Sequence, residues 1–336
     1  MKRSTNRDLM VLTALAPMVE LLLLSRGLRV NTSLVHVCVT LTCYQAGYLV
    51  ADFVRRLGQN TLRPVTAGLM LLLGVSLIYW SWIFTAVLAL AFSAALQAWR
   101  RSLKPASSVT PKKKNTMKAI GMAAGGLGAL PNPVVIGACL TASVVLLIAC
   151  RSAVQFTKVD PAAPTPGSAL LLLGESVHHA HYFAYAYVMW ARIAHLPLPL
   201  MGMLFIIGWI GYFLAEYLVR DRHRIFSPKA MALGHAVCSA AICAMVFTTS
   251  LAPTMLLWFT TGLAGGTAFM LGNGPQHPNR ERFEDLGHVV GIGGAALVLA
   301  PVGTPVAALW LAVVLAAIAA AIFVAVPTNA QPLSRR

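Results

Sequence analysis

A short apolar stretch near the middle of the chain, residues 168–190, carries several side chains that can hold or transfer a proton. At about 100° per residue, four of them share one helical face, whereas His181 points to a flank. The four are Glu175, His178, His179 and Tyr182. Imidazole beside carboxylate suits proton handling, because histidine titrates near neutral pH. We therefore predict that this face binds a substrate or carries a coupling proton.

Three more ionisable residues lie in other apolar runs. Glu284 and His288 are one helical turn apart and can touch at i, i+4, and Glu20 lies near the middle of the first run. A charge at the bilayer centre costs about 2.5 to 3.5 kcal/mol on insertion scales, so each such residue is a functional hypothesis. The alternative is structural: Glu284 and Asp285 would stabilise a helix start, and the histidines would only bond neighbouring helices.

The elements that position these residues must be membrane helices. Hydrophobic residues make up 58% of the chain and charged residues 11%, with a mean hydropathy of +0.73, whereas globular domains average about a quarter charged. A helix needs about 20 apolar residues to cross a bilayer, and the apolar runs here are long and continuous. The composition indicates an integral membrane protein of the all-α class.

Hydropathy predicts twelve spans, six in each half, with short connections. They lie near 8–26, 33–54, 65–82, 83–100, 116–132, 133–150, 168–190, 198–219, 229–249, 253–272, 284–301 and 305–326. The hairpins at 80–82 and 131–133 have almost no connector, so the count depends on a break at each. We expect two six-helix bundles, residues 1–151 and 168–336, joined by a proline-containing cytoplasmic linker, 152–167.

The basic residues agree with this topology. The net charge is +16, and with a cytoplasmic N-terminus all but three of the 26 Lys and Arg fall on the cytoplasmic side. The exceptions are Arg26, Arg29 and Arg192. This asymmetry is what the positive-inside rule predicts. We expect a multi-pass protein of the cytoplasmic membrane with both termini in the cytoplasm, a lipid bilayer as its surroundings, and no nucleic-acid partner.

Cofactor motifs are absent from the sequence. The six cysteines lie in or at the ends of apolar runs without a CxxC pair, which is typical of small core residues. Membrane di-iron enzymes use several separated histidine motifs, whereas the histidines here form one tight cluster. Taken singly, His36, His181 and His235 are expected to be packing residues. We predict no cofactor and no metal site, although Glu175, His178 and His179 could contact a metal or metal-chelate substrate.

A ten-residue pattern occurs twice. Gly47–Arg56 reads GYLVADFVRR, and Gly211–Arg220, 164 residues later, reads GYFLAEYLVR. Pro64 and Pro228 continue the same register. Each copy ends an apolar run in a carboxylate followed by arginine, which indicates duplication of a half-chain unit.

Two six-span halves in parallel repeat, each with an acidic residue and arginine closing its second span, resemble the major facilitator superfamily. The resemblance implies a transporter whose spans one and seven line a central cavity, so that Glu20 faces the 168–190 cluster. It also implies two cytoplasmic gate elements. The first comprises Asp52, Arg55 and Arg56, and the second comprises Glu216 and Arg220.

The expected function is secondary active transport of a small organic solute by alternating access, coupled to protons, with export favoured over uptake. The solute would be a drug-like molecule, a peptide or a metal-chelating metabolite, and the protein a monomer. Because no phosphate-binding loop is present, ATP-driven transport by this chain is not expected. Two alternatives stay open: a membrane-embedded enzyme using the His/Glu cluster, and a non-transporting receptor or scaffold.

Overall fold

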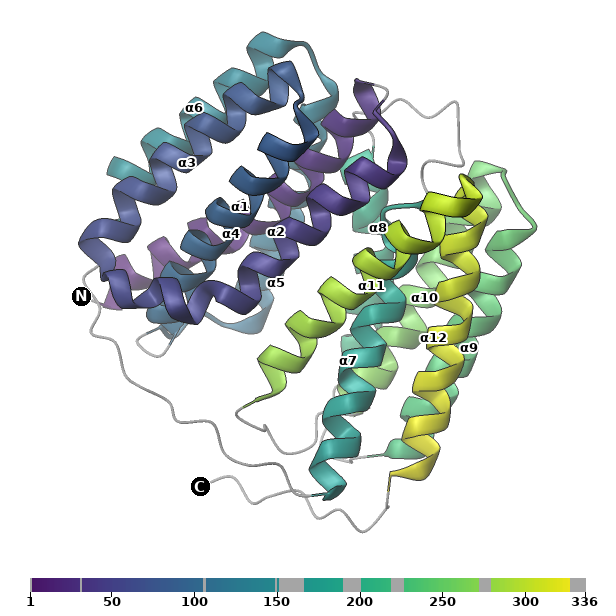
Figure 1. Cartoon of the computed structure of the whole chain (residues 1–336). Helices are drawn as coiled ribbons and strands as arrows, with labels where there is room; N and C mark the ends of the chain where they lie inside the picture. The colour runs from purple at the N-terminus through teal and green to yellow at the C-terminus, as the bar shows by residue number, and fades with distance from the viewer. Residues whose placement is uncertain are drawn as a thin grey trace. The chain divides into compact units, whose positions relative to one another are not determined.

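The computed structural model describes residues 2–30, 32–104, 107–148, 150, 166–189, 201–218, 227–271 and 279–326 (Figure 1). Within these ranges the chain forms twelve α-helices with short 3-10 turns and no strand. The helices are α1 (Lys2–Arg29), α2 (Leu34–Val54), α3 (Gln59–Tyr79), α4 (Trp82–Leu103), α5 (Pro111–Gly125), α6 (Asn132–Ile148), α7 (Pro166–Ala186), α8 (Met201–Leu218), α9 (Pro228–Val246), α10 (Leu251–Leu271), α11 (Arg280–Val302) and α12 (Pro305–Ala325).

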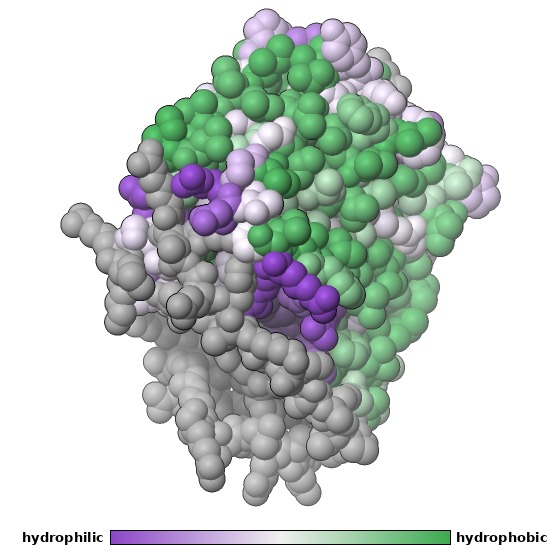
Figure 2. Space-filling view, turned by 60° about the vertical axis from the view of Figure 1, so that its left-hand side comes forward, coloured by the Kyte–Doolittle hydropathy of each residue, from purple (hydrophilic) through white to green (hydrophobic). Residues whose placement is uncertain are grey.

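The all-α prediction is confirmed, and the helices follow the predicted spans in order. Among the described residues, seven helices are long and apolar enough to cross a membrane: α1 to α4, α9, α11 and α12. Large apolar side chains such as Ile83, Phe84 and Val87 on α4 are exposed. Figure 2 shows a broad hydrophobic face on the described part of the surface. Such faces suit contact with lipid, as expected of a multi-pass membrane protein.

Both tight hairpins contain the break on which the helix count depends. The α3 helix ends at Tyr79, and Trp80 adopts a left-handed conformation with φ 39° while its N–H donates to the Ser76 carbonyl at 2.8 Å. The α5 helix tightens into a 3-10 turn at Gly126–Ala129 before α6 begins at Asn132. The chain therefore reverses at these two places and does not continue as one broken helix.

Two compact units divide the chain. One comprises Met1–Val159 with Leu196–Met203, and the other comprises Asp160–His195 with Leu204–Arg336. In the first unit α1 packs on α5, α2 on α4 and α3 on α6. In the second, α7 packs on α11 and α9 on α12, and α8 meets α10 at Gly211. Each unit thus pairs its first helix with its fifth, its second with its fourth and its third with its sixth.

The contact between the first and fifth helices of a unit, called here the first-to-fifth crossing, has the same register in both units. A side chain at Gly121 or Gly125 on α5 would collide with the Ala14 or Met18 carbonyl oxygen on α1. In the second unit, Gly287 and Gly291 on α11 meet the carbonyl oxygens of two α7 residues in the same way; these are Ser176 and Ala180. In each unit, two glycines four residues apart lie against two carbonyl groups four residues apart. Both crossings require helices in backbone contact.

The second-to-fourth crossing also repeats. A Cβ on Gly47 would lie 2.8 Å from the Leu90 oxygen and 2.7 Å from the Ala94 nitrogen. An added Cβ on its counterpart Gly211, 164 residues later, would lie against the oxygen of Phe259 and 2.9 Å from the nitrogen of Leu263. The repeated sequence motif therefore corresponds to a repeated helix contact. This supports the duplication inferred from the sequence.

A buried arginine holds the first unit together at the end of α1. Arg26 is 4% exposed. Its Nε donates to the Leu77 carbonyl at 2.8 Å, and its terminal nitrogens donate to the Leu130 carbonyl and the Asn132 side-chain oxygen. The guanidinium thereby satisfies carbonyl groups at the ends of α3 and of the 3-10 turn after α5. Arg26 was counted from sequence as an outer-side charge, and its contacts give it a structural role.

Candidate functional site

The ionisable residues of α7 face more than one neighbouring helix. His178 and His181 lie against His235 of α9, with ring centroids 4.8 and 5.5 Å from the His235 ring. Glu175 and His179 lie against α11. The four residues share one face of α7, but that face spans about 100° and its edges meet different helices. His181 does point to a flank, but that flank is where α9 packs.

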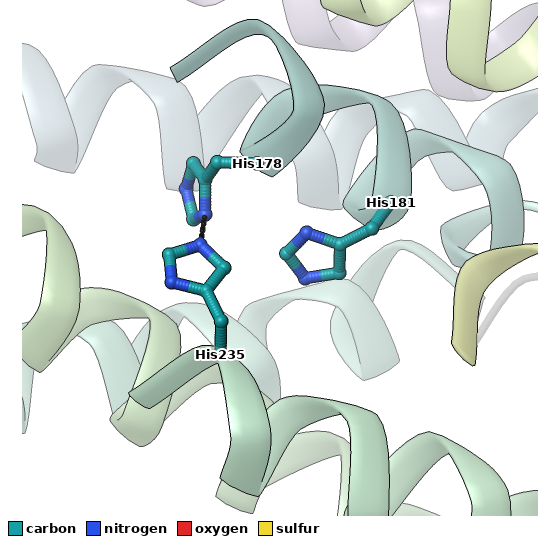
Figure 3. A group of neighbouring side chains, drawn as sticks. All are labelled: His178, His181 and His235. Carbon is teal, nitrogen blue, oxygen red and sulfur yellow. Dashed lines mark hydrogen bonds between the residues drawn. The ribbon is translucent and has the colours of Figure 1, made fainter. Parts of the chain in front are cut away.

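Three imidazole rings converge between α7 and α9 (Figure 3). His178 Nδ1 lies 2.7 Å from His235 Nε2. One nitrogen from each of His178, His181 and His235 falls within 4.8 Å of the other two. His181 and His235, expected from sequence to be separate packing residues, thus form a cluster with His178.

The hydrogen bonds determine which nitrogens carry protons in the neutral cluster. His235 Nδ1 lies 2.7 Å from the Met231 carbonyl oxygen, which can only accept, so Nδ1 of His235 must donate. Its Nε2 then carries a lone pair and accepts from Nδ1 of His178. The Met231 carbonyl, four residues earlier on the same helix, therefore orients the His235 ring with its Nε2 toward α7.

The cluster is almost closed to solvent. His181 is 2% exposed and His235 is 1% exposed, and the Phe323 ring of α12 lies 5.0 Å from that of His235. The His181 ring stacks against Tyr185 at 6.5 Å. His181 Nδ1 is buried without a hydrogen-bond partner. A buried polar atom without a partner costs free energy, so it needs an explanation in a native structure.

A second polar group lies between α7 and α11. The Arg280 guanidinium bridges two carboxylates, with 3.1 Å from its Nη2 to Glu175 Oε1 and 2.8 Å from its Nε to Glu284 Oε1. The Glu175 side chain is 7% exposed, that of Arg280 15% and that of Glu284 24%. Burial removes water screening, so these ion pairs are stronger than surface pairs and more costly to break singly. Arg280 was predicted only as a topological charge.

Two histidines, His179 of α7 and His288 of α11, lie next to this ion-pair group. His179 Nδ1 donates to the Glu175 carbonyl oxygen at 2.8 Å, and its ring centroid lies 5.0 Å from that of His288. The His288 ring packs on Phe183 at 4.0 Å. The two predicted clusters, one on each helix, thus lie together in the second unit, although Glu284 bonds to Arg280 where His288 had been expected.

Tyr182 faces a third helix. Its ring stacks on Trp258 of α10 at 5.5 Å with 23° between the planes, and its edge meets Tyr185 at 6.1 Å. Tyr185 in turn donates from its hydroxyl to the Thr261 hydroxyl at 2.9 Å. This aromatic group lies between α7 and α10, and it reaches the histidine cluster through Tyr185, which stacks on His181.

Glu20 lies within the first unit, where it is 8% exposed. Gln45 of α2 donates from Nε2 to Glu20 Oε1, and the neighbouring Tyr44 donates from its hydroxyl to the Ala16 carbonyl at 2.7 Å. Two side chains of α2 therefore bind polar groups of α1. That Glu20 faces the α7 cluster across a substrate path stays a prediction.

The gate residues are described only in the first copy. Asp52 pairs with Arg101 of α4 at 3.3 Å, and the Arg56 guanidinium lies 5.8 Å above the Phe53 ring. Arg55 caps the C-terminal end of α2. The side chain of Glu216 and the whole of Arg220 lie outside the described residues.

Neither a protein-family model nor a curated protein sequence matches this chain. The fold and the site together define a helical membrane protein built from two repeated units, the second of which contains a buried histidine cluster and a bridged pair of carboxylates. Sequence reasoning missed three contributors: His181, His235 and Arg280. The one signal for His235 was its place as a single ionisable residue within an apolar run.

Proposed function

We propose that this protein is a secondary active transporter that moves a small organic solute across the cytoplasmic membrane by alternating access. The observation that carries the proposal is the repetition of two helix crossings, at the same glycine register, in the two units. Many secondary transporters are built from such internal repeats, with the substrate site at the repeat interface and one repeat moving against the other.

Proton coupling is proposed from the charges between α7 and α11. Arg280 contacts both Glu175 and Glu284, so the three side chains of this group include, among the described residues, one more carboxylate than guanidinium. His179 and His288 lie beside it and can take up a proton. A proton or a cationic substrate would neutralise the extra charge, and its release would restore it. Buried ionisable groups of this kind mark proton and substrate pathways in membrane proteins.

Gating at the cytoplasmic end is proposed for Asp52. The Asp52–Arg101 pair links the ends of α2 and α4, and the Asp52 carboxylate side chain is 35% exposed. The Arg101 side chain is 10% exposed, so the pair is only partly exposed. Ion pairs that keep access to water contribute little free energy, which allows them to open and close within a transport cycle. Export is the proposed direction.

Solute-driven proton movement tests the proposal. The purified chain is reconstituted in liposomes containing a pH-sensitive dye, and amphipathic drugs, dipeptides and metal-chelating metabolites are added singly. We expect at least one compound to move protons in the intact protein. Glu175→Gln and His179→Ala should abolish the signal, whereas Glu281→Gln, an exposed change on the first turn of α11, should retain it.

The same vesicles test the alternatives. If no compound moves protons faster than in protein-free liposomes, the transport proposal fails. Flux unchanged by Glu175→Gln would leave transport standing but overturn the assignment of the coupling site. Comparing vesicles of opposite orientation decides between export and uptake.

A further inference from the structure

We propose that His178, His181 and His235 bind a first-row transition-metal dication, with Zn²⁺ the expected ion, between α7 and α9 of the second unit. Three nitrogens within 4.8 Å of one another form the donor set. This inference goes beyond the proposed function and does not depend on it. A metal site here would stand whether or not the chain transports a solute.

The chemistry of the donors fits such an ion. Neutral imidazole is a ligand for Zn²⁺, Cu²⁺ and Ni²⁺, and Zn²⁺ commonly takes three protein ligands with a water or substrate in the fourth position. Zinc–nitrogen bonds of about 2.0 to 2.1 Å in a tetrahedral site place the nitrogens about 3.4 Å apart. The present separations are 2.7 Å between His178 and His235 and at most 4.8 Å in the set. Small rotations of the rings would therefore bring them to coordination distance.

One ligand is already oriented by an outer contact. His235 donates its Nδ1 proton to the Met231 carbonyl, which fixes its tautomer and presents Nε2 to the cluster. Metal-bound histidines are held in this way by a carbonyl or carboxylate on the other ring nitrogen. For Nδ1 of His178 to bind the ion, its ring proton moves to Nε2. That shift changes no net charge.

The unsatisfied nitrogen of His181 points to a ligand independently of the distances. His181 is 2% exposed, and its Nδ1 makes no well-formed hydrogen bond, although the backbone of Val177 and His178 interacts with the ring. Leaving a buried ring nitrogen unpaired costs free energy, whereas an ion bound by the imidazole would add a favourable contact to this buried side chain. In Figure 3 the His181 ring points toward the other two rings.

The repeated architecture indicates that the helix packing does not itself require these histidines. The α1 and α7 positions at the first-to-fifth crossing correspond with an offset of 162 residues, as in Ala14 with Ser176 and Met18 with Ala180. By that register His178 corresponds to Ala16 and His181 to Val19. Those two residues are 1% and 0% exposed. The first unit therefore buries the equivalent positions with ordinary apolar side chains.

Metal binding is measured on the full chain, purified in detergent without a histidine tag and stripped with a chelator. Zn²⁺ is titrated by calorimetry, and Co²⁺ is used as a spectroscopic probe of tetrahedral nitrogen ligation. We expect one ion per chain. His178→Gln, His181→Gln and His235→Gln should each weaken binding at least tenfold, whereas His179→Gln, beside the cluster on the same helix, should leave it unchanged.

A second variant protects the test from misfolding. The double change His178→Ala/His181→Val installs the residues that the first unit carries, so the helix should still pack, and binding should be lost while the helical circular-dichroism signal is retained. The proposal is overturned if Zn²⁺ and Co²⁺ do not bind saturably, or if binding persists in the triad variants. Zinc that copurifies with the chain before chelator treatment identifies a resident ion, whereas zinc entry into dye-loaded liposomes identifies a transported ion. Either result should be lost in the triad variants.

Discussion

Replacing Arg280 should destabilise the protein far more than replacing either of its carboxylate partners. In Arg280→Gln, Glu175 loses its guanidinium partner while its side chain is only 7% exposed. Removing one member of a buried ion pair costs about 3 to 5 kcal/mol, because the remaining charge is left uncompensated. Glu284 is 24% exposed and can regain water, so most of the cost arises at Glu175.

The reverse substitution should be mild. In Glu175→Gln, Arg280 keeps its 2.8 Å contact with Glu284, so no charge is left alone, and the expected cost is about 1 kcal/mol, the scale of a typical hydrogen bond. The double variant Glu175→Gln/Arg280→Gln should be more stable than Arg280→Gln alone, since the unpaired carboxylate is gone. This strong non-additivity is expected of residues in one polar network.

Thermal unfolding of the purified protein in detergent measures these differences. One kcal/mol corresponds to about 2 to 4 °C for a unit of 150 to 250 residues, so Arg280→Gln should lower the midpoint by roughly 6 to 20 °C. Arg282→Gln is the matched control, because Arg282 is exposed two residues further along α11. The reasoning is refuted if Arg280→Gln behaves like Arg282→Gln, or if the double variant is no more stable than Arg280→Gln.

Three further substitutions test other parts of the fold by thermal unfolding, unless stated otherwise. Gly291→Ala should lower the midpoint because its Cβ collides with the α7 backbone. The control Gly137→Ala, at a helix position with nothing within 4 Å, should raise the midpoint because alanine has a helix propensity better by roughly 1 kcal/mol. Equal shifts in the two variants would contradict the crossing of α7 and α11. Arg26→Gln should cost about 2 to 4 kcal/mol through its buried hydrogen bonds, and the exposed Arg29→Gln should be near neutral; a neutral Arg26→Gln would rule out its structural role. Asp52→Asn should change the midpoint by less than about 4 °C, since a partly exposed pair is worth under about 1 kcal/mol. It should nevertheless alter solute-driven proton flux, and unchanged flux would exclude a gating role.

Much of the fold could be predicted from the sequence because lipid imposes a simple rule. Every bilayer crossing must be apolar and must satisfy its own backbone, so hydropathy gives the order of the helices. It does not give their ends. The α5 helix begins at Pro111 and not near 116, because hydropathy excludes the lysine-rich first turn, whereas Thr110 caps that turn by accepting from the Lys113 N–H.

Less of the site was predictable, because helical periodicity identifies a face but not the helix that covers it. Glu175 and His179 were expected to act together, and they do share α11 as their neighbour. His178, only one residue before His179, faces α9 instead. His235 is 57 residues further along the chain, and no local pattern links it to His178. Such pairing is a property of tertiary packing.

Arg280 shows a different limit of sequence reasoning. As a basic residue at a helix end predicted to be cytoplasmic, it agreed with the positive-inside rule, and that explanation was sufficient without any specific contact. The structure gives it two carboxylate partners. A residue that satisfies a general rule can also have a particular role, and only its neighbours reveal which applies.

The repeated glycine crossings have a consequence for how the chain tolerates mutation. At Gly121, Gly125, Gly287 and Gly291 an added Cβ would collide with a main-chain oxygen, and no side-chain substitution on the partner helix can remove that atom. A scan of all single substitutions should therefore show the same pattern of intolerance twice, once in each unit, with two blocked positions one turn apart. Insertions should be accepted in the connections between helices, because the sequence offset between corresponding residues of the two units already differs from one helix to the next. They should be rejected within any helix that carries a crossing.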